Sequence, residues 1–219
     1  GCPDGASIRL PLPFRIHAFM PAVRLALLLA AAAPLGHAAA LNVSVTDAAG
    51  KPLADAVVML EPASGKAPVK PLPDVEISQA KRQFNPRVTL ITVGTRVAFP
   101  NFDTVRHHVY SFSQAKTFEL KLYAGVPAAP IVFDKPGLAV LGCNIHDRMA
   151  AWVVVADTPW FARTAADGTA RIEGAPAGAY RLASWHPGLP ANSAPLVQNL
   201  QLGGGEQRET VQLAVDAAP

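Results

Sequence analysis

Residues 138–156 read LAVLGCNIHDRMAAWVVVA, two apolar runs separated by a short polar segment. Each run, 138–143 and 151–156, is too short for a typical helix and is bounded by residues that favour turns. The segment between them has the spacing C-x2-H-x2-M, formed by Cys143, His146 and Met149. The stretch therefore predicts two strands joined by a loop that carries a thiol, an imidazole and a thioether.

The same organisation continues through the chain from Leu41 to Pro219. Short runs rich in Val, Ile, Leu, Thr and Phe are bounded by Gly, Pro, Asp and Asn, and no long amphipathic helix is evident. In 118–122 apolar and charged residues alternate, as expected for a strand with one face in a core and one in water. These patterns predict an all-β chain. The expected strands are 41–46, 56–61, 75–79, 87–93, 95–100, 107–112, 118–123, 131–134, 138–143, 151–156, 170–173 and 180–185, with two more near 196–202 and 208–214.

The first 40 residues have the features of a leader. Met20 and Arg24 precede an apolar run over 25–33, and small residues follow up to Ala40. This is typical of a secretory signal peptide, and the run is shorter than the roughly 20 residues that span a bilayer. A buried core helix is the alternative. We expect residues 1–40 to be an upstream segment and signal peptide, and the rest to be a periplasmic protein without a membrane span.

Removal of the leader changes the charge. It takes away three arginines and one aspartate, so the formal net charge of +3 falls by two. A nearly neutral chain gives no reason to expect nucleic acid or an anionic membrane as a partner. The sequence also lacks G-x-S-x-G, H-E-x-x-H and a glycine-rich phosphate loop.

The leader contains Cys2, so its removal leaves Cys143 alone in an oxidising compartment. Three interpretations are open for such a thiol. It could be an inert core residue, form an intermolecular disulfide, or act as a metal-bound or catalytic thiolate.

Upstream, the segment NFDTVRHHV places His107 and His108 at the start of the expected strand 107–112. One thiolate, two imidazoles and a weak thioether form the donor set of blue-copper electron-transfer sites. Successive side chains of a strand point to opposite faces. Only one of the two histidines is therefore expected to face a metal, and we favour His107.

The block 74–156 resembles the cupredoxins, the amicyanin- and plastocyanin-like blue copper proteins. The resemblance rests on C-x2-H-x2-M, on the N-x5-H-H-V segment that begins at Asn101, and on the strand after Met149. It implies a cupredoxin Greek-key β-sandwich over 68–156 that holds one mononuclear type 1 copper. The implied copper ligands are His107, Cys143, His146 and Met149.

The resemblance also implies residues around these ligands. Asn101 matches a family asparagine whose side chain ties the strand of the first ligand to the residue after the cysteine, here Asn144. His108 would lie beside the site. Arg106, His108 and Asp147 depart from the family pattern, which leaves the first histidine ligand and the reduction potential open.

The two ends of the remaining chain resemble the halves of a carboxypeptidase-regulatory-like, prealbumin-type β-sandwich. Residues 41–61 contain an Asp-x-x-Gly turn between two strands, and 163–182 contain an Asp-Gly turn, a strong hairpin signal. This predicts a second, smaller β-sandwich module formed by 41–62 plus 157–216, discontinuous around the block 68–156. Three serial pieces are the alternative. The matching residues are Val45, Asp47, Gly50, Pro52, Leu53, Ala56, Val57, Val58, Asp167, Gly168, Ile172, Pro176, Gly178 and Tyr180.

The function that these resemblances imply is a periplasmic one-electron carrier between redox partner proteins, not an enzyme. Two alternatives share the same residues. The chain could deliver or sense copper in the periplasm, or it could be a binding module with a degenerate metal site.

Overall fold

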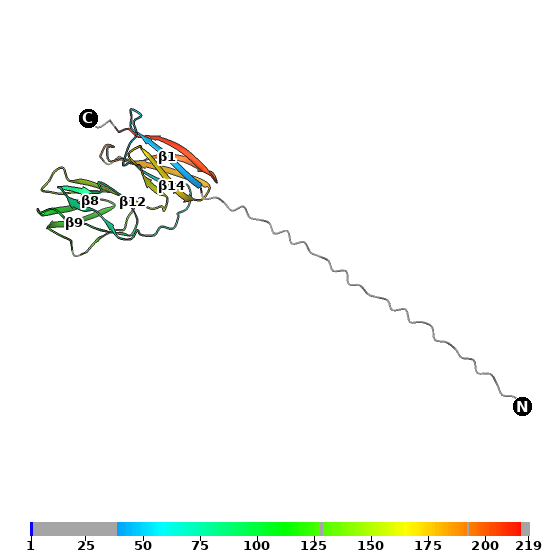
Figure 1. Ribbon diagram of the computed structural model, residues 1–219, viewed down its shortest axis with the longest axis horizontal. Helices are drawn as coiled ribbons and strands as arrows, with labels where there is room; N and C mark the ends of the chain where they lie inside the picture. The colour runs from blue at the N-terminus through cyan, green and yellow to red at the C-terminus, as the bar shows by residue number, and fades with distance from the viewer. Residues whose placement is uncertain (2–38, 128, 192, 216–219) are drawn as a thin grey trace. The chain divides into compact units, whose positions relative to one another are not determined.

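The computed structural model describes residue 1 and residues 39–127, 129–191 and 193–215 (Figure 1). These residues form seventeen strands and no helix, so the prediction of an all-β chain is confirmed. The described part contains no helix that is long and apolar enough to cross a membrane. The expected signal peptide lies almost wholly outside the described residues.

Two sheets are built from the chain ends. One has the order β14-β1-β17, in which β1 pairs antiparallel with β14 and parallel with β17. The other has the order β13-β2-β15-β16 and is antiparallel. The strands are β1 (Ala39–Thr46), β2 (Val57–Pro62), β13 (Phe161–Arg163), β14 (Thr169–Ala175), β15 (Gly178–Trp185), β16 (Leu196–Leu202) and β17 (Glu206–Gln212).

These two sheets share one apolar core. Alternate residues of β1, such as Leu41 and Val43, are fully buried against Val58 and Leu60 of β2 and Leu182 of β15. Because side chains alternate along a strand, a period-two apolar pattern buries one face of each sheet in this core.

The strands between residues 75 and 156 form three further sheets. A five-stranded sheet has the order β6-β12-β11-β8-β9, a three-stranded sheet has the order β10-β7-β3, and β4 and β5 form a hairpin. The strands are β3 (Val75–Glu76), β4 (Ser78–Ala80), β5 (Gln83–Asn85), β6 (Val88–Thr92), β7 (Thr95–Ala98), β8 (His107–Ser113), β9 (Lys116–Tyr123), β10 (Ile131–Phe133), β11 (Gly137–Gly142) and β12 (Ala150–Ala156).

A second core lies between the five- and three-stranded sheets. It joins Val109 of β8, Leu141 of β11 and Val153 of β12 to Val97 of β7 and Phe133 of β10. Cys143 and Met149 belong to the same buried cluster. The loop between β11 and β12 is thereby anchored in the core at both of its ends.

A third apolar cluster joins the outer faces of the two largest sheets. Met59 of β2 and Trp185 of β15 pack with Val88 of β6 and Val154 of β12. The Arg163 guanidinium adds a hydrogen bond to the Val88 carbonyl. Strands β2 and β12 are therefore buried on both faces, which explains why their sequences are continuously apolar rather than alternating.

Gly168 lies in the turn before β14. Its substitution tests how closely this turn packs on β1. Its φ is +74°, and a Cβ atom there would lie 2.6 Å from the Val45 carbonyl oxygen. We expect Gly168→Ala to lower the free energy of unfolding by about 2–5 kcal/mol, measured in urea. The left-handed backbone accounts for about 1–2 kcal/mol and the steric clash for about 1–3 kcal/mol.

Gly50 provides the matched control for this substitution. Its φ is +80°, but a Cβ atom there would meet nothing within 4 Å. Gly50→Ala should therefore cost only the backbone contribution of about 1–2 kcal/mol. Equal losses in the two variants would contradict the packing argument.

Candidate metal centre

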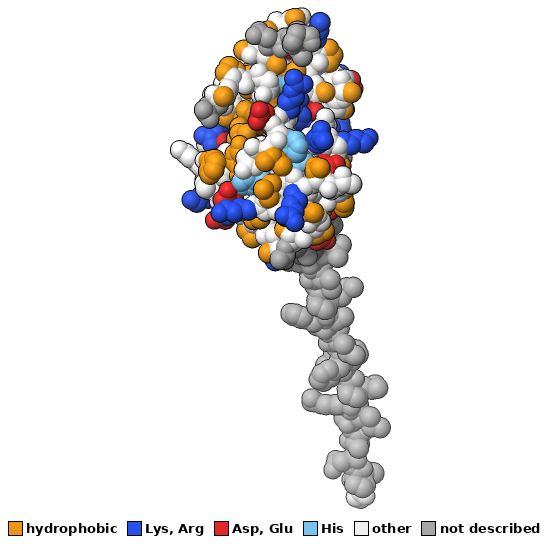
Figure 2. All heavy atoms as spheres, turned by 90° about the vertical axis from the view of Figure 1, so that its left-hand side faces the viewer, with side chains coloured by type: hydrophobic (Ala, Val, Ile, Leu, Met, Phe, Trp, Pro, Cys, Tyr) orange, Lys and Arg blue, Asp and Glu red, His pale blue; other side chains and the backbone are white. Residues whose placement is uncertain are grey.

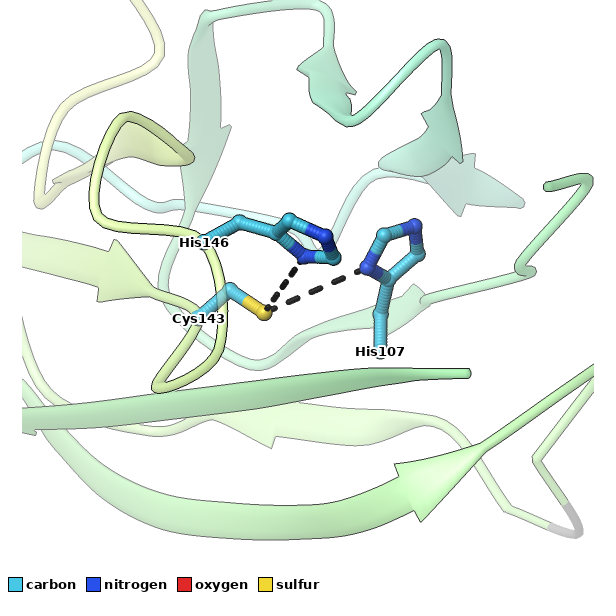
Figure 3. A group of neighbouring side chains, drawn as sticks. All are labelled: His107, Cys143 and His146. Carbon is cyan, nitrogen blue, oxygen red and sulfur yellow. Dashed lines mark hydrogen bonds between the residues drawn. The ribbon is translucent and has the colours of Figure 1, made fainter. Parts of the chain in front are cut away.

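Three side chains with metal-binding atoms converge at the end of the second core (Figure 3). His107 comes from the first residue of β8, and Cys143 and His146 come from the loop after β11. Cys143 Sγ lies 4.0 Å from His107 Nδ1 and 3.8 Å from His146 Nδ1. One ion can bridge such distances, because metal bonds to sulfur and imidazole nitrogen are about 2.0–2.3 Å long.

The burial of the three residues is graded. His107 is fully buried and Cys143 nearly so, whereas His146 is half-buried. The two imidazole rings meet edge to face, with centroids 4.9 Å apart. The sulfur is thereby shielded from solvent, and His146 is the ligand candidate that reaches toward the surface.

Asp103 holds the His107 ring in place. The carboxylate Oδ2 accepts a hydrogen bond from His107 Nε2 at 2.7 Å. This bond places the ring proton on Nε2 and leaves Nδ1, which faces Cys143, free to bind a metal. Sequence reasoning missed Asp103. The available signal was an aspartate four residues before the histidine.

The Asp103 carboxylate is itself fixed by the turn between β4 and β5. The Lys81 N–H donates to Oδ1 at 2.6 Å and the Arg82 N–H donates to Oδ2 at 2.9 Å. Burial alone would raise the pKa of Asp103, but the donors Arg82, His107 and Lys81 together lower it below its ordinary value. The carboxylate is therefore ionised at neutral pH and accepts the hydrogen bond from the imidazole N–H.

His108 points to the other face of β8. Its ring packs edge to face on Tyr110, and its Nε2 lies 3.0 Å from Glu119 Oε1. The alternation of side chains on a strand accounts for this separation, since His107 and Val109 face the core together. Of the two neighbouring histidines, the structure brings only His107 to Cys143.

Asn101 organises the loop that leads to His107. Its side-chain amide donates to the carbonyl oxygens of Val105 at 2.9 Å and Tyr123 at 2.8 Å, and its Oδ1 accepts the Asp103 N–H. The expected tie to Asn144 is not among the hydrogen bonds of the described residues. Asn101 instead closes its own loop over five residues, and the Asn144 side chain is exposed.

Tyr123 of β9 supports the strand that carries His107. Burial raises the pKa of Tyr123 to about 12, so the phenol stays protonated and donates to the Phe99 carbonyl at 2.6 Å. Its hydroxyl also contacts the buried Gln79 amide. These bonds connect β9 to β4 and to the loop before Asn101. They fix Tyr123, the residue of β9 that pairs with His107.

Met149 ends the ligand loop. Its side chain is buried in the cluster that contains Cys143, and its N–H donates to the His146 carbonyl at 2.9 Å. The bond closes a turn over 146–149, so that one short loop carries both His146 and Met149. Met149 is thus held in the interior beside the thiol.

With copper as the probe ion, we expect Asp103→Asn to weaken metal binding about 10–100-fold, the usual effect of losing a partner of a metal-bound histidine. The substitution removes a negative charge that would stabilise Cu(II) more than Cu(I). The reduction potential of the bound copper should therefore rise. Chelator competition measures the affinity, and spectroelectrochemistry measures the potential. Asp147→Asn is the control, because Asp147 is exposed and has no ion pair within the described residues. Identical effects in both variants would contradict a role for the Asp103–His107 bond.

The chain matches no protein-family model and no curated protein. It is similar to several solved structures over parts of its length. A purple cupredoxin from Nitrosopumilus maritimus has 23% identity and a TM-score of 0.33, covering 38% of this chain and 100% of that one. A reduced Cu(I) form of the P52G mutant of amicyanin has 17% identity and a TM-score of 0.35, covering 45% and 98%.

A Cu-containing nitrite reductase (NirK) from Thermus scotoductus SA-01 has 26% identity and a TM-score of 0.36. That alignment covers 51% of this chain and 28% of the reductase. The similarities are thus partial, and the chain spans under a third of the length of that reductase.

Proposed function

We propose that this chain binds one copper ion in a mononuclear type 1 site and carries single electrons between redox proteins of the periplasm. The ligands would be His107 Nδ1, Cys143 Sγ and His146 Nδ1, with Met149 as a weak fourth ligand. The observation that carries this proposal is the convergence of a buried thiol and two imidazole Nδ1 atoms within 4.8 Å of one another.

The donor set fits copper in both of its oxidation states. A thiolate and a thioether are soft ligands suited to Cu(I), whereas imidazoles also bind Cu(II). The bond from His107 to Asp103 already selects the tautomer with a free Nδ1. Ligands held in this way would move little between the two oxidation states, which is the property that rapid electron transfer requires.

Copper would supply the one-electron couple that protein side chains lack. The chain itself has three tasks. Asp103 orients His107, the apolar core around Cys143 excludes water, and the half-buried His146 ring gives a route from the interior to the surface. We propose that a partner receives or gives the electron at the His146 edge.

Titration of the metal-free protein with Cu(II) tests this proposal. We expect one equivalent to produce an intense visible band from the thiolate-to-copper transition, which ascorbate should bleach and air or another oxidant restore. A colourless protein that takes up no copper would instead favour a binding module. Rapid loss of the metal to a weak chelator would favour copper delivery over electron transfer.

A further inference from the structure

Four loops meet around the edge of His146 and His107. The turn at Lys81 and Arg82 is held by Asp103, and the Asn101 backbone pairs with Gly125. The loop 143–149 joins them through the contacts of Cys143. The segments 81–82, 101–106, 124–127 and 144–148 therefore form one surface around the candidate metal centre.

Exposed cations gather on this surface. Lys81, Arg82, Arg106 and Arg148 are exposed, and none of them belongs to the ion pairs of the described residues. We call these four residues the basic rim.

Little negative charge balances the basic rim. Asp103 is occupied by His107 and two backbone N–H groups, and Asp147 is the other carboxylate within these loops. Elsewhere on the molecule, cations such as Lys116, Arg171 and Arg181 are paired with carboxylates. The metal end therefore has a local positive field.

The same loops carry exposed apolar side chains. Phe102 is 65% exposed, Ile145 48% and Val105 37%. We call these three residues the apolar centre. The face drawn in Figure 2 has histidine and hydrophobic side chains near its middle, with lysine and arginine side chains around them. Large exposed apolar residues surrounded by polar ones are typical of a surface that binds another protein.

Building on the proposed function, we infer that this surface docks an acidic redox protein, one that places carboxylates against the basic rim and apolar atoms against the apolar centre. Opposite charges guide the two proteins into an encounter and raise the association rate about 10–1,000-fold at low salt. The apolar centre then permits close, dry contact at the His146 edge, where the electron crosses.

A protein suits this surface better than a polyanion or a lipid bilayer does. The four cations come from three separate segments, 81–82, 101–106 and 144–148, which also carry the apolar centre, whereas a phosphate backbone offers charge without apolar surface. Interfaces with an apolar core and a polar rim are the usual form of protein–protein contacts.

The first test uses metal-free protein and decaglutamate as the probe, followed by NMR chemical-shift mapping. We expect shifts confined to residues 81–82, 101–106 and 144–148, and at least about five-fold weaker binding in the double variant Arg106→Glu/Arg148→Glu. Lys51→Glu/Lys70→Glu is the control, because it changes the net charge equally at exposed residues outside the four loops. Shifts elsewhere, or equal losses in both double variants, would overturn the inference.

The second test uses copper-loaded, ascorbate-reduced protein and follows its oxidation by stopped flow. Hexacyanoferrate(III) accepts one electron per protein and becomes hexacyanoferrate(II), with no atom or proton transferred. Its rate should fall with added salt in the wild type and rise with salt in Arg106→Glu/Arg148→Glu. A cationic tris(phenanthroline)cobalt(III) oxidant should respond in the opposite way. If the salt dependence of the oxidation rate is the same in the wild type and in Arg106→Glu/Arg148→Glu, the inference is overturned.

The two proposals fail separately. A protein that forms no coloured copper site contradicts the proposed function, while the decaglutamate map still decides whether the basic rim binds carboxylates. Sedimentation with phosphatidylglycerol vesicles at about 0.15 M salt measures whether the protein binds an anionic bilayer, and we expect no binding. Binding to vesicles that needs the basic rim, together with no binding of decaglutamate, would identify a membrane and overturn the acidic partner.

Discussion

Replacing Cys143 by serine should abolish the visible band of the copper-loaded protein and lower its copper affinity by more than about 100-fold, beyond the loss caused by removing an outer partner of a ligand. Cys143 is the one free cysteine among the described residues, and its sulfur faces the Nδ1 atoms of both His107 and His146. A serine hydroxyl is a hard donor that stays protonated at neutral pH, so it replaces neither the soft bond nor the thiolate charge.

The fold should survive this substitution, which makes the result interpretable. Serine has nearly the size of cysteine, and circular dichroism together with the urea midpoint should show a loss of no more than about 1–2 kcal/mol. Met149→Leu is the matched control, since it removes the thioether but keeps the buried volume. It should retain a coloured site with an altered potential. A Cys143→Ser protein that keeps the band would contradict the ligand assignment.

The strands could be predicted because their patterns are local. The strand expected over 118–123 reappears as β9, and the apolar runs before and after the ligand loop reappear as β11 and β12. The alternation holds for Phe118 and Leu120, which pack on the second core, but not for Leu122, which is 48% exposed. The packing of these strands was less accessible. The continuous apolar sequence of β12 arises because Val153 faces one core and Val154 faces the cluster that β2 and β15 complete. A run of that kind indicates two covered faces but does not name what covers them.

Some strand boundaries could not be predicted from the sequence. The single strand expected over 75–79 is two short strands, β3 and β4, that pair with different partners, β7 and β5. Turn chemistry at residues 81–82, where both non-glycine residues have positive φ, creates the short hairpin. The division into a block 68–156 and a module of 41–62 plus 157–216 stays a prediction, although each group of strands pairs within itself.

The candidate site was predictable where its residues are close in sequence and obscure where they are not. Cys143, His146 and Met149 share one loop, and their spacing indicated a common ion once the upstream N-x5-H segment and the flanking strands were considered with it. Asp103 acts on His107 only because the turn at Lys81 and Arg82 fixes its carboxylate. That support crosses some twenty residues of chain and follows no periodic pattern. The same long-range contact brings two cations of the basic rim to the metal end.

The choice between the two adjacent histidines leads to the second large effect. We expect His107→Gly to lose the visible copper band and His108→Gly to keep it. His107 is fully buried with Nδ1 facing Cys143, whereas His108 packs on Tyr110 on the opposite face of β8. Both substitutions remove a buried ring and introduce glycine into the same strand, so their costs in stability should be similar, about 1–4 kcal/mol by urea unfolding. The difference in colour therefore reports ligation and not general damage.

Added imidazole sharpens this comparison. The space left by His107→Gly is bordered by Asp103 and by the sulfur of Cys143, so a free imidazole can donate one N–H to the carboxylate and turn its other nitrogen toward the metal. Imidazole should then restore the band in His107→Gly and leave His108→Gly unchanged, as followed by absorption during titration. Loss of colour in His108→Gly with retention in His107→Gly would reverse the assignment, because the ligand would then have to come from the outer face of β8. Asp103 gives the rescue its selectivity, since in Asp103→Asn/His107→Gly the same imidazole concentration should restore less of the band.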